Sequence, residues 1–214
     1  MVKKIAITGP IGSGKTHISN LFIETIGIPV FYSDTEAKKL YVEDEYVKSE
    51  MSSIFGPATY NWGEFNSELV ANIIFTDDKY MRKVTHLIKG PLLRKFYDWF
   101  YKIRYNPFNE KPTFTLYESA VMSKETYCMF DHIFIVDADI KIRKVRVSKR
   151  SGLIGEKFKE RNSRQPDTEE IITILDKLEI PYTIINNDGV ADLIPIIKEI
   201  AITHGWEEGN KNEI

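Results

Sequence analysis

The fold of this chain is decided by the stretch Gly9-Pro10-Ile11-Gly12-Ser13-Gly14-Lys15-Thr16. An apolar run, Ile5-Ala6-Ile7, comes just before it, and residues 16–26 after it have the apolar spacing of a helix. The stretch therefore lies where a strand turns into a helix, and its spacing is that of the phosphate-binding P-loop. A glycine-rich turn with a solvated lysine is the alternative interpretation, which the flanking strand and helix patterns disfavour.

The residue types of this loop predict a site for a nucleoside triphosphate. Glycine tolerates the positive φ angles that let a short loop fold around an anion with its backbone N–H groups turned inward. The helix that begins near Gly14 adds partial positive charge at its N-terminus. In such loops the lysine, here Lys15, bridges the β- and γ-phosphates, and the hydroxyl of Thr16 is a ligand of Mg²⁺. We therefore expect ATP and Mg²⁺ as cofactors.

Composition and charge exclude several classes of function. The chain has 214 residues, 43% of them hydrophobic, and its 29 Lys and Arg nearly balance 31 Asp and Glu. This near-neutral charge does not favour a nucleic-acid or membrane-surface partner. The single cysteine, Cys128, forms no internal disulfide and has no companion at metal-ligand spacing. The chain has neither an apolar run of about 18 residues nor a signal-peptide pattern, so we expect a cytoplasmic protein without a membrane span.

Short apolar runs alternate with helical patterns along the chain, which predicts an α/β fold. The expected strands lie at residues 3–8, 28–32, 113–117, 133–136 and 180–185. Such alternation favours parallel strands joined by right-handed crossovers. Together with the P-loop, it predicts the P-loop NTPase fold, a five-stranded parallel sheet flanked by helices. We expect a single domain over residues 1–204 and a frayed polar tail over residues 205–214.

One acidic residue, Asp34, follows the second expected strand directly. In an open α/β sheet, ligands bind beyond the carboxyl ends of the strands, which places Asp34 on the same rim as the P-loop. An acid at this position can accept the proton of an attacking hydroxyl or help to hold the metal. It can equally be the N-cap of the next helix, a common role for aspartate. Spacing alone leaves both interpretations open.

The pattern changes between about residues 44 and 105, where the chain is mostly helical and lacks strand alternation. We expect this region to be a helical insertion that encloses a substrate. It carries an aromatic run from Phe96 to Tyr101. These rings could stack on a base, but aromatic residues at helical spacing are more often part of a core, and we favour the core.

A basic run follows the fourth strand, with Lys141, Arg143, Lys144, Arg146, Lys149, Arg150, Lys157, Lys159, Arg161 and Arg164. Several of these residues must form an ordinary solvated helix face. A phosphoryl-transfer site, however, also needs cations opposite the P-loop and a movable segment that excludes water. Ser151-Gly152 and Gly155 provide hinge-like positions within the run. We therefore predict a basic lid at about residues 150–166.

Several short motifs occur in the same order as in one known family. The chain resembles the dephospho-coenzyme A kinases, P-loop kinases of the nucleoside monophosphate kinase type, over most of its length. In the first of these motifs, residues 8–15 depart from the family pattern only at Pro10. The others are Asp34 with Ala37 and Leu40, Ile54-Phe55-Gly56, Tyr117-Glu118-Ser119, Phe130-Asp131, Val136-Asp137, Arg146 and Arg150 with Gly152-Leu153, Arg161 with Gln165, and Ile185 with Asn187 and Gly189.

This resemblance implies transfer of the γ-phosphate of ATP to the ribose 3′-hydroxyl of dephospho-coenzyme A, a step of coenzyme A biosynthesis. The implied catalytic residues are Lys15, Asp34, Arg150 and Arg161. The implied nucleotide-binding residues are Gly9, Ile11, Gly12, Ser13, Gly14, Lys15, Thr16, His17, Arg146 and Asn187. Asp34 and Glu118 are implied to lie near the acceptor, and Thr16 to bind Mg²⁺.

The chain departs from the family pattern at three places. An Asp-Arg pair is replaced by Asn66-Ser67, a His-Pro pair by Gly90-Pro91, and a Pro-Leu-Leu run by residues 114–116. We expect these changes to fall in the region that encloses the substrate, so they bear on the acceptor rather than on the phosphate donor.

Two alternative functions follow from the same donor half. A (deoxy)nucleoside monophosphate kinase would need an arginine clamp in the helical region, where Arg82, Arg94 and Arg104 are available. A non-catalytic nucleotide-binding module would need neither the acid after the second strand nor a basic lid. Turnover with a monophosphate would identify the first alternative, and tight ATP binding without turnover would identify the second.

Overall fold

The computed structural model describes residues 1–107 and 111–208, which form two compact units. The sheet unit contains Met1–Tyr32 and the chain from Asn106 onward, and the helical unit contains Ser33–Tyr105. The helical unit begins before the predicted start of the insertion near residue 44. The reason is that helix α2 (Ser33–Glu43) packs against α3 (Glu45–Phe55) and α5 (Asp78–Arg104) within this unit.

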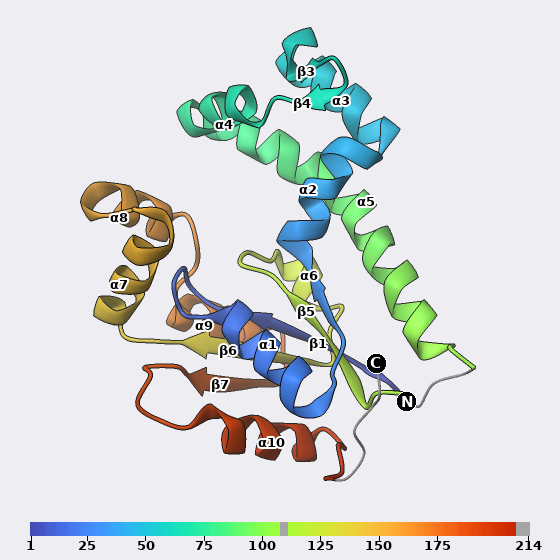
Figure 1. Ribbon diagram of the computed structural model, residues 1–214, viewed down its shortest axis with the longest axis vertical. Helices are drawn as coiled ribbons and strands as arrows, with labels where there is room; N and C mark the ends of the chain where they lie inside the picture. The colour runs from blue at the N-terminus through green and yellow to red at the C-terminus, as the bar shows by residue number, and fades with distance from the viewer. Residues whose placement is uncertain (108–110, 209–214) are drawn as a thin grey trace. The chain divides into compact units, whose positions relative to one another are not determined.

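The sheet unit is built on the predicted five-stranded parallel sheet, with strand order β2-β5-β1-β6-β7 (Figure 1). The strands are β1 (Lys3–Thr8), β2 (Val30–Tyr32), β5 (Phe114–Glu118), β6 (His132–Asp137) and β7 (Tyr182–Asn186). Because all pairs are parallel, the carboxyl ends of the strands meet at one edge. Glu118, for example, lies opposite both Ile7 and Tyr32.

The helices of the sheet unit are α1 (Lys15–Ile26), α6 (Lys124–Tyr127), α7 (Ile140–Ser151), α8 (Gly155–Ser163), α9 (Thr168–Lys177) and α10 (Leu193–Thr203). Helices α1 and α10 lie side by side and close the main core against the sheet (Figure 1). At its centre, Phe22 of α1 stacks on Phe134 of β6 with 5.4 Å between ring centroids. Burying a phenylalanine side chain contributes about 1.5–3 kcal/mol.

The start of the expected tail is part of this core, so the prediction of a frayed tail is wrong for residues 205–208. Trp206 is buried within the main core cluster, and its backbone N–H donates to Ala201 O at 3.0 Å. Glu208 pairs with Lys198 of α10 at 2.6 Å. The indole explains the difference, because its apolar area favours burial even within a polar stretch. The remainder of the expected tail, residues 209–214, lies outside the described residues.

The helical unit also contains a small hairpin, which the sequence pattern does not indicate. A 3-10 turn (Pro57–Thr59) leads into β3 (Tyr60–Asn61), which pairs antiparallel with β4 (Glu64–Phe65). The two turn residues, Trp62 and Gly63, both have positive φ, at 53° and 87°, as a tight two-residue hairpin requires. Strands of two residues are too short to show an alternating pattern in the sequence.

Asn66, a departure from the family pattern, has a structural role in this unit. Helix α4 (Ser67–Thr76) begins directly after it, and the Asn66 side chain accepts a hydrogen bond from Leu69 N at 3.1 Å. Asparagine and aspartate are equally good N-caps, so the exchange preserves the helix start. The core of the unit contains Leu40, Val47, Met51, Val70 and Val84.

The other two departures differ in setting. Residues 114–116 form most of β5 in the sheet unit, where Phe114 and Leu116 belong to the main core. The expectation that this change falls in the substrate-enclosing region is therefore wrong, because it concerns the packing of the sheet. Gly90 lies on α5, and a Cβ added there meets no atom within 4 Å. Packing therefore does not require glycine at this position.

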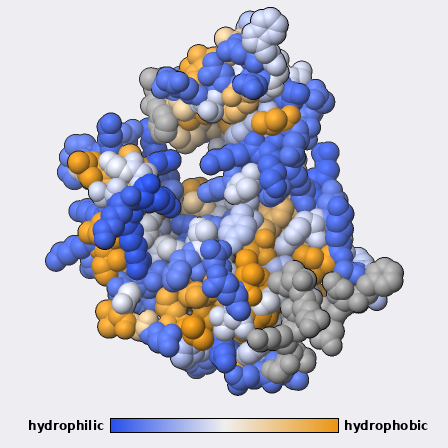
Figure 2. Space-filling view, viewed as in Figure 1, coloured by the Kyte–Doolittle hydropathy of each residue, from blue (hydrophilic) through white to orange (hydrophobic). Residues whose placement is uncertain are grey.

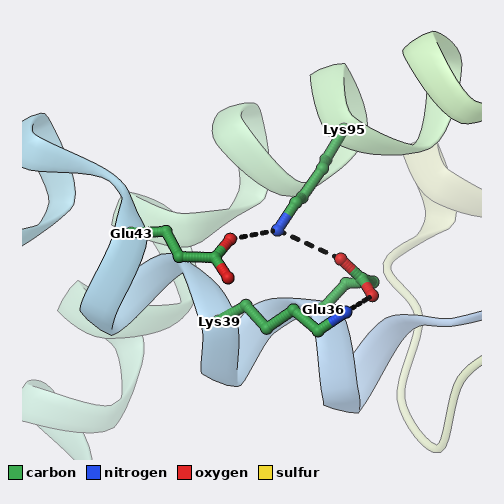
Figure 3. A network of polar contacts seen from close by, with 4 residues as sticks. All are labelled: Glu36, Lys39, Glu43 and Lys95. Atoms are coloured by element: carbon green, nitrogen blue, oxygen red, sulfur yellow. Dashed lines mark hydrogen bonds and ion pairs between the residues drawn. The ribbon is translucent and has the colours of Figure 1, made fainter.

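A charged network ties α2 to α5 within the helical unit (Figure 3). Lys95 of α5 contacts Glu36 and Glu43 of α2 at 3.1 and 3.0 Å. Partial burial lowers the pKa of Lys95, but the hydrogen bonds to Glu43 and Glu36 outweigh burial, so its pKa is raised.

Within the aromatic run, Phe96 and Phe100 are buried, which confirms the core assignment for these two rings.

Candidate active site

The P-loop lies between β1 and α1, where the sequence places it, and its glycines are required by geometry. Gly9, Gly12 and Gly14 have φ angles of 145°, 80° and 96°. A Cβ added to Gly9 would lie 2.1 Å from Val136 O, which excludes any larger residue. Gly14 is the N-cap of α1, so the amino end of this helix opens into the loop. The expected strand-loop-helix arrangement is confirmed.

Two predicted nucleotide-binding residues, Arg146 and Asn187, meet at the outer side of the loop. Asn187 Nδ2 and Arg146 Nη1 both donate to Ser13 O, at 2.8 and 3.2 Å. Arg146 Nη2 also donates to Asn187 Oδ1 at 3.4 Å. The structure therefore brings together residues from the P-loop, from α7 and from the end of β7. Of these residues, Asn187 and Ser13 are 174 positions apart in the sequence.

Lys15 is buried against the loop in this arrangement. Its ammonium group donates to Gly9 O at 2.8 Å and to Pro10 O at 3.3 Å. These carbonyl groups satisfy the charge, which would otherwise be costly to bury. The residue therefore places a positive charge within the concave loop, next to backbone N–H groups that favour anions.

Thr16 and Glu118 form an oxygen pair at the same edge of the sheet. The Thr16 hydroxyl donates to Glu118 Oε2 at 3.3 Å. Nearby, the pKa of Tyr32 is raised, mainly because the side chain is partly buried and in addition because of the negative charges of Glu118 and Glu24. Hydroxyl and carboxylate oxygens are donors that Mg²⁺ accepts. The described residues contain no group of three or more His, Cys, Asp or Glu that could hold a metal.

The remaining loop residues have distinct environments. The side chain of Ile11 packs in a small cluster with Val147 and Phe158, so only its backbone can face a nucleotide. Ser13 Oγ is fully buried and has no hydrogen-bond partner in the described chain. His17, in the first turn of α1, is exposed.

Two of the predicted lid cations, Arg150 and Arg161, are exposed. Neither makes a hydrogen bond or ion pair with the part of the chain that the structure describes. Arg150 lies in the last turn of α7, which ends at Gly152, and Arg161 lies in the last turn of α8, which begins at Gly155. Both glycines are left-handed, with φ of 66° and 54°. Apolar side chains also stay exposed here, as Figure 2 shows over α7 and α8, where Ile154 is 67% exposed.

Asp34 lies in the first turn of α2, in the helical unit, and is exposed. Its side chain forms no hydrogen bond with the described residues, so the helix-capping role is not observed. A carboxylate in a first helical turn is still favoured by the helix dipole. Asp34 follows Tyr32, the last residue of β2, by two positions, as the sequence predicts.

Arg143 also contacts the P-loop, although the sequence pattern does not distinguish it from the other cations of the basic run. It is 8% exposed, and it contacts the backbone of the P-loop at Ile11 O. A signal was available, because Arg143, Arg146 and Val147 recur at helical spacing on one face of α7. The run of surrounding lysines concealed this face.

The fold and site are those of a P-loop kinase. They combine a P-loop between β1 and α1, the oxygen pair of Thr16 and Glu118 at the carboxyl edge of the sheet, and the basic helices α7 and α8. A sequence model described as dephospho-CoA kinase (CoaE) matches residues 3–192. The dephospho-CoA kinase of Bacteroides fragilis (strain YCH46) is 30% identical over 201 residues, covering 94% of this chain and 92% of the relative. That of Aquifex aeolicus is 28% identical over 93% and 96% of the two chains. The chain therefore belongs to the dephospho-CoA kinase family.

A solved structure supports the same fold. The protein TT1252 from Thermus thermophilus superposes with a TM-score of 0.76 at 20% identity, covering 96% of this chain and 99% of the other. Neither alternative function from the sequence analysis is favoured by these comparisons. In the described part of the chain, no helix combines the length and apolar character needed to cross a bilayer.

Proposed function

We propose that this chain transfers the γ-phosphate of ATP to the ribose 3′-hydroxyl of dephospho-coenzyme A, which yields coenzyme A and ADP. The observation that carries the proposal is the family match over residues 3–192. The geometry of the loop supports it, because Asn187 contacts Ser13 O and Lys15 contacts Gly9 O, which brings residues proposed to bind a donor nucleotide close to the loop. We keep the cytoplasm as the expected compartment.

In the proposed donor site, the backbone N–H groups of the loop and Lys15 bind the β- and γ-phosphates. Arg146 and Asn187 support the loop from outside and bind the nucleotide. Thr16 holds Mg²⁺, and the contact between Thr16 and Glu118 supports this position, because it supplies two oxygen donors. When bound, Mg²⁺ neutralises charge on the phosphates.

In the proposed transfer step, Asp34 accepts the proton of the 3′-hydroxyl as that oxygen forms a bond to the γ-phosphorus. The bond from this phosphorus to the oxygen that bridges it to the β-phosphate breaks, and ADP leaves. Arg150 and Arg161 stabilise the negative charge on the transferred group. Their exposure and lack of partners in the described chain support this role, because both guanidinium groups are available to a ligand. Glu118 is proposed to lie beside the acceptor as well.

The acceptor is tested by a coupled ADP-release assay with Mg-ATP. We expect turnover with dephospho-coenzyme A and none with a panel of ribo- and deoxyribonucleoside monophosphates. Turnover with a monophosphate instead would contradict the proposal and show that the departures at Asn66, Ser67 and Gly90 accompany a different acceptor. ATP binding without turnover of any acceptor would identify a nucleotide-binding module.

The role of Asp34 is tested in the same assay. Asp34→Asn should lower kcat by about 10²-fold to 10⁴-fold, the usual contribution of a general base, with little change in KM for ATP. A large rise in KM for ATP with kcat unchanged would assign Asp34 to the binding of the metal and nucleotide instead.

A further inference from the structure

Arg143 of α7 donates hydrogen bonds to three separate segments of the sheet unit. Its Nε donates to Ala138 O, just after β6, at 3.1 Å. Its Nη1 donates to Ile11 O of the P-loop at 3.3 Å and to Asn162 Oδ1 of α8 at 2.9 Å. One buried guanidinium thus joins the end of a strand, the phosphate-binding loop and helix α8, which lies within the predicted lid.

Such an arrangement is costly in free energy. Arg143 makes no ion pair with the described residues, and burial lowers its pKa, which the more distant charges of three aspartates partly offset. Burying a charge without a paired carboxylate is unfavourable, and well-packed apolar residues often stabilise a protein as well or better. Stability alone therefore does not account for an arginine at this position.

The contacts do control the orientation of peptide groups in the P-loop. The carbonyl of Ile11 points to Arg143, and the carbonyl of Ser13 points to Arg146 and Asn187. In a trans peptide, the carbonyl and the following N–H point in opposite directions. The N–H groups of Gly12 and Gly14 are consequently turned away from α7, in the direction from which a loop of this kind binds phosphate.

Close packing adds to this constraint. A Cβ on Gly12 would lie 2.7 Å from Arg143 O, so the loop touches the backbone of α7 directly. The Ile11 side chain packs on Val147 of α7 and Phe158 of α8. Phe158 is the only buried residue among the nine of α8, all of which the structure describes. Helix α8 is therefore held mainly at Phe158 and at Asn162, and both contacts connect to Ile11.

We propose that Arg143 is a positioning residue that sets the phosphate-binding conformation of the P-loop and couples it to helix α8 through Asn162. Arg143 acts by holding Ile11 O, and it does not touch the nucleotide. The proposal rests on the proposed function only in assuming that the P-loop binds the phosphates of ATP.

The test measures binding of ATP with Mg²⁺ by calorimetry, without any acceptor, for Arg143→Met, Arg143→Lys and Asn162→Ala. Arg143→Met should raise the Kd for ATP by about 10-fold to 100-fold, the range expected when groups at a site are displaced by roughly 1 Å. Arg143→Lys should not restore binding, because an ammonium lacks the planar fork that reaches several acceptors. Asn162→Ala keeps the Ile11 contact and should raise the Kd less, while amide exchange in α8 becomes faster.

Lys144→Met is the matched control. Lys144 is the next residue of the same helix, is exposed and makes no hydrogen bond or ion pair with the described chain. The Lys144→Met variant should bind ATP with the same Kd as the parent protein. In the steady-state assay, the Arg143 variants should raise KM for ATP while leaving KM for dephospho-coenzyme A unchanged, a separation that general destabilisation does not produce.

Three outcomes overturn the proposal: a lower Tm with unchanged ATP affinity in Arg143→Met, equal losses in Lys144→Met, or an unchanged Kd and unchanged α8 exchange in Asn162→Ala. The calorimetric result does not depend on turnover. If the parent protein binds ATP but does not phosphorylate dephospho-coenzyme A, the proposed function fails while the role of Arg143 is still decided by the binding constants.

Discussion

At the carboxyl edge of the sheet, β1 runs into the P-loop, whose carbonyl groups are held by side chains from α7 and from the end of β7. At the amino edge, β6 begins with His132, whose ring centroid lies 4.6 Å from that of His204. His132 Nε2 and Thr183 Oγ1 share a hydrogen bond at 2.9 Å. The first edge holds three glycines with positive φ, Gly9, Gly12 and Gly14. The second packs its histidines among core rings such as Phe134.

This difference indicates a division of labour within one sheet. Glycine loses more backbone entropy on folding than any other residue, so a loop that needs three of them costs stability, and we infer that the protein retains them for the ligand. Aromatic packing at the opposite edge adds stability that is independent of the ligand. Substitutions at the two edges should therefore separate activity from stability, and the following predictions test that separation from the largest effect to the smallest.

The largest effect is expected at Lys15. Lys15→Ala removes the charge that we propose follows the transferred phosphate, and kcat/KM should fall by about 10³-fold or more, as is typical when a phosphoryl-transfer cation is lost. Tm should stay close to that of the parent protein, because the substitution removes the ammonium that must be desolvated as well as the hydrogen bonds to Gly9 O and Pro10 O that compensate for its burial. Steady-state kinetics and thermal unfolding check both parts. An unaltered kcat/KM in Lys15→Ala would contradict the assignment of residues 9–16 as the phosphate-binding loop.

A smaller effect on rate is expected at Arg150, at the end of α7. Arg150→Ala should lower kcat by about 10²-fold, in line with the loss of one charge-stabilising donor. It should leave Tm unchanged, because the side chain is exposed and has no partner in the described chain. Lys149→Ala, an exposed neighbour, is the control. Equal effects of the two variants would mean that only the overall charge of the helix matters.

The amino edge should control the pH dependence of stability. Burial first, and then the charges of His204 and Lys3, lower the pKa of His132 from 6.5 to about 4. Between these pH values His132 is protonated in the unfolded chain and neutral in the folded chain. The free energy of unfolding should thus fall as pH drops from about 6.5 to 4, by at most about 1.4 kcal/mol per pH unit. Above pH 6.5 this histidine contributes no pH dependence.

His132→Gln removes the titrating group and keeps a polar partner for Thr183. Denaturant unfolding between pH 4 and 7 should therefore show a shallower slope than in the parent protein. The residual slope comes in part from His204, whose pKa burial and Lys3 also lower. At neutral pH, kcat should be unchanged. A loss of activity in this variant would contradict the separation of the two edges.

Much of the sheet unit could be predicted, because its signals are local. The apolar runs predict all five strands to within two residues at each end, and the glycine spacing predicts the P-loop. Asn187 and Arg146 were identified only through the family resemblance, since nothing in their neighbouring residues indicates a contact with Ser13. The roles of Asp34, Arg150 and Arg161 remain predictions.

The missed features have two causes: strands too short to show a pattern, and burial that depends on partners far away in the sequence. The hairpin at Tyr60–Phe65 has strands too short for a periodic signal. Trp206 is apolar within a polar stretch, and only the packing of α10 shows that it is buried. Arg143 has the same charge as its solvated neighbours, and its burial follows from the approach of the P-loop to α7.

The sequence by itself determined the chemistry at the start of the first helix and the positions of the strands along the chain. Glycine spacing and apolar periodicity act over a few residues, so they can be recognised without the fold. Only the tertiary structure decided which carbonyl groups of the loop are held, and by which side chains. That choice depends on contacts between segments more than 130 positions apart, such as Arg143 with Ile11, which form only when the parallel sheet brings α7 against the loop.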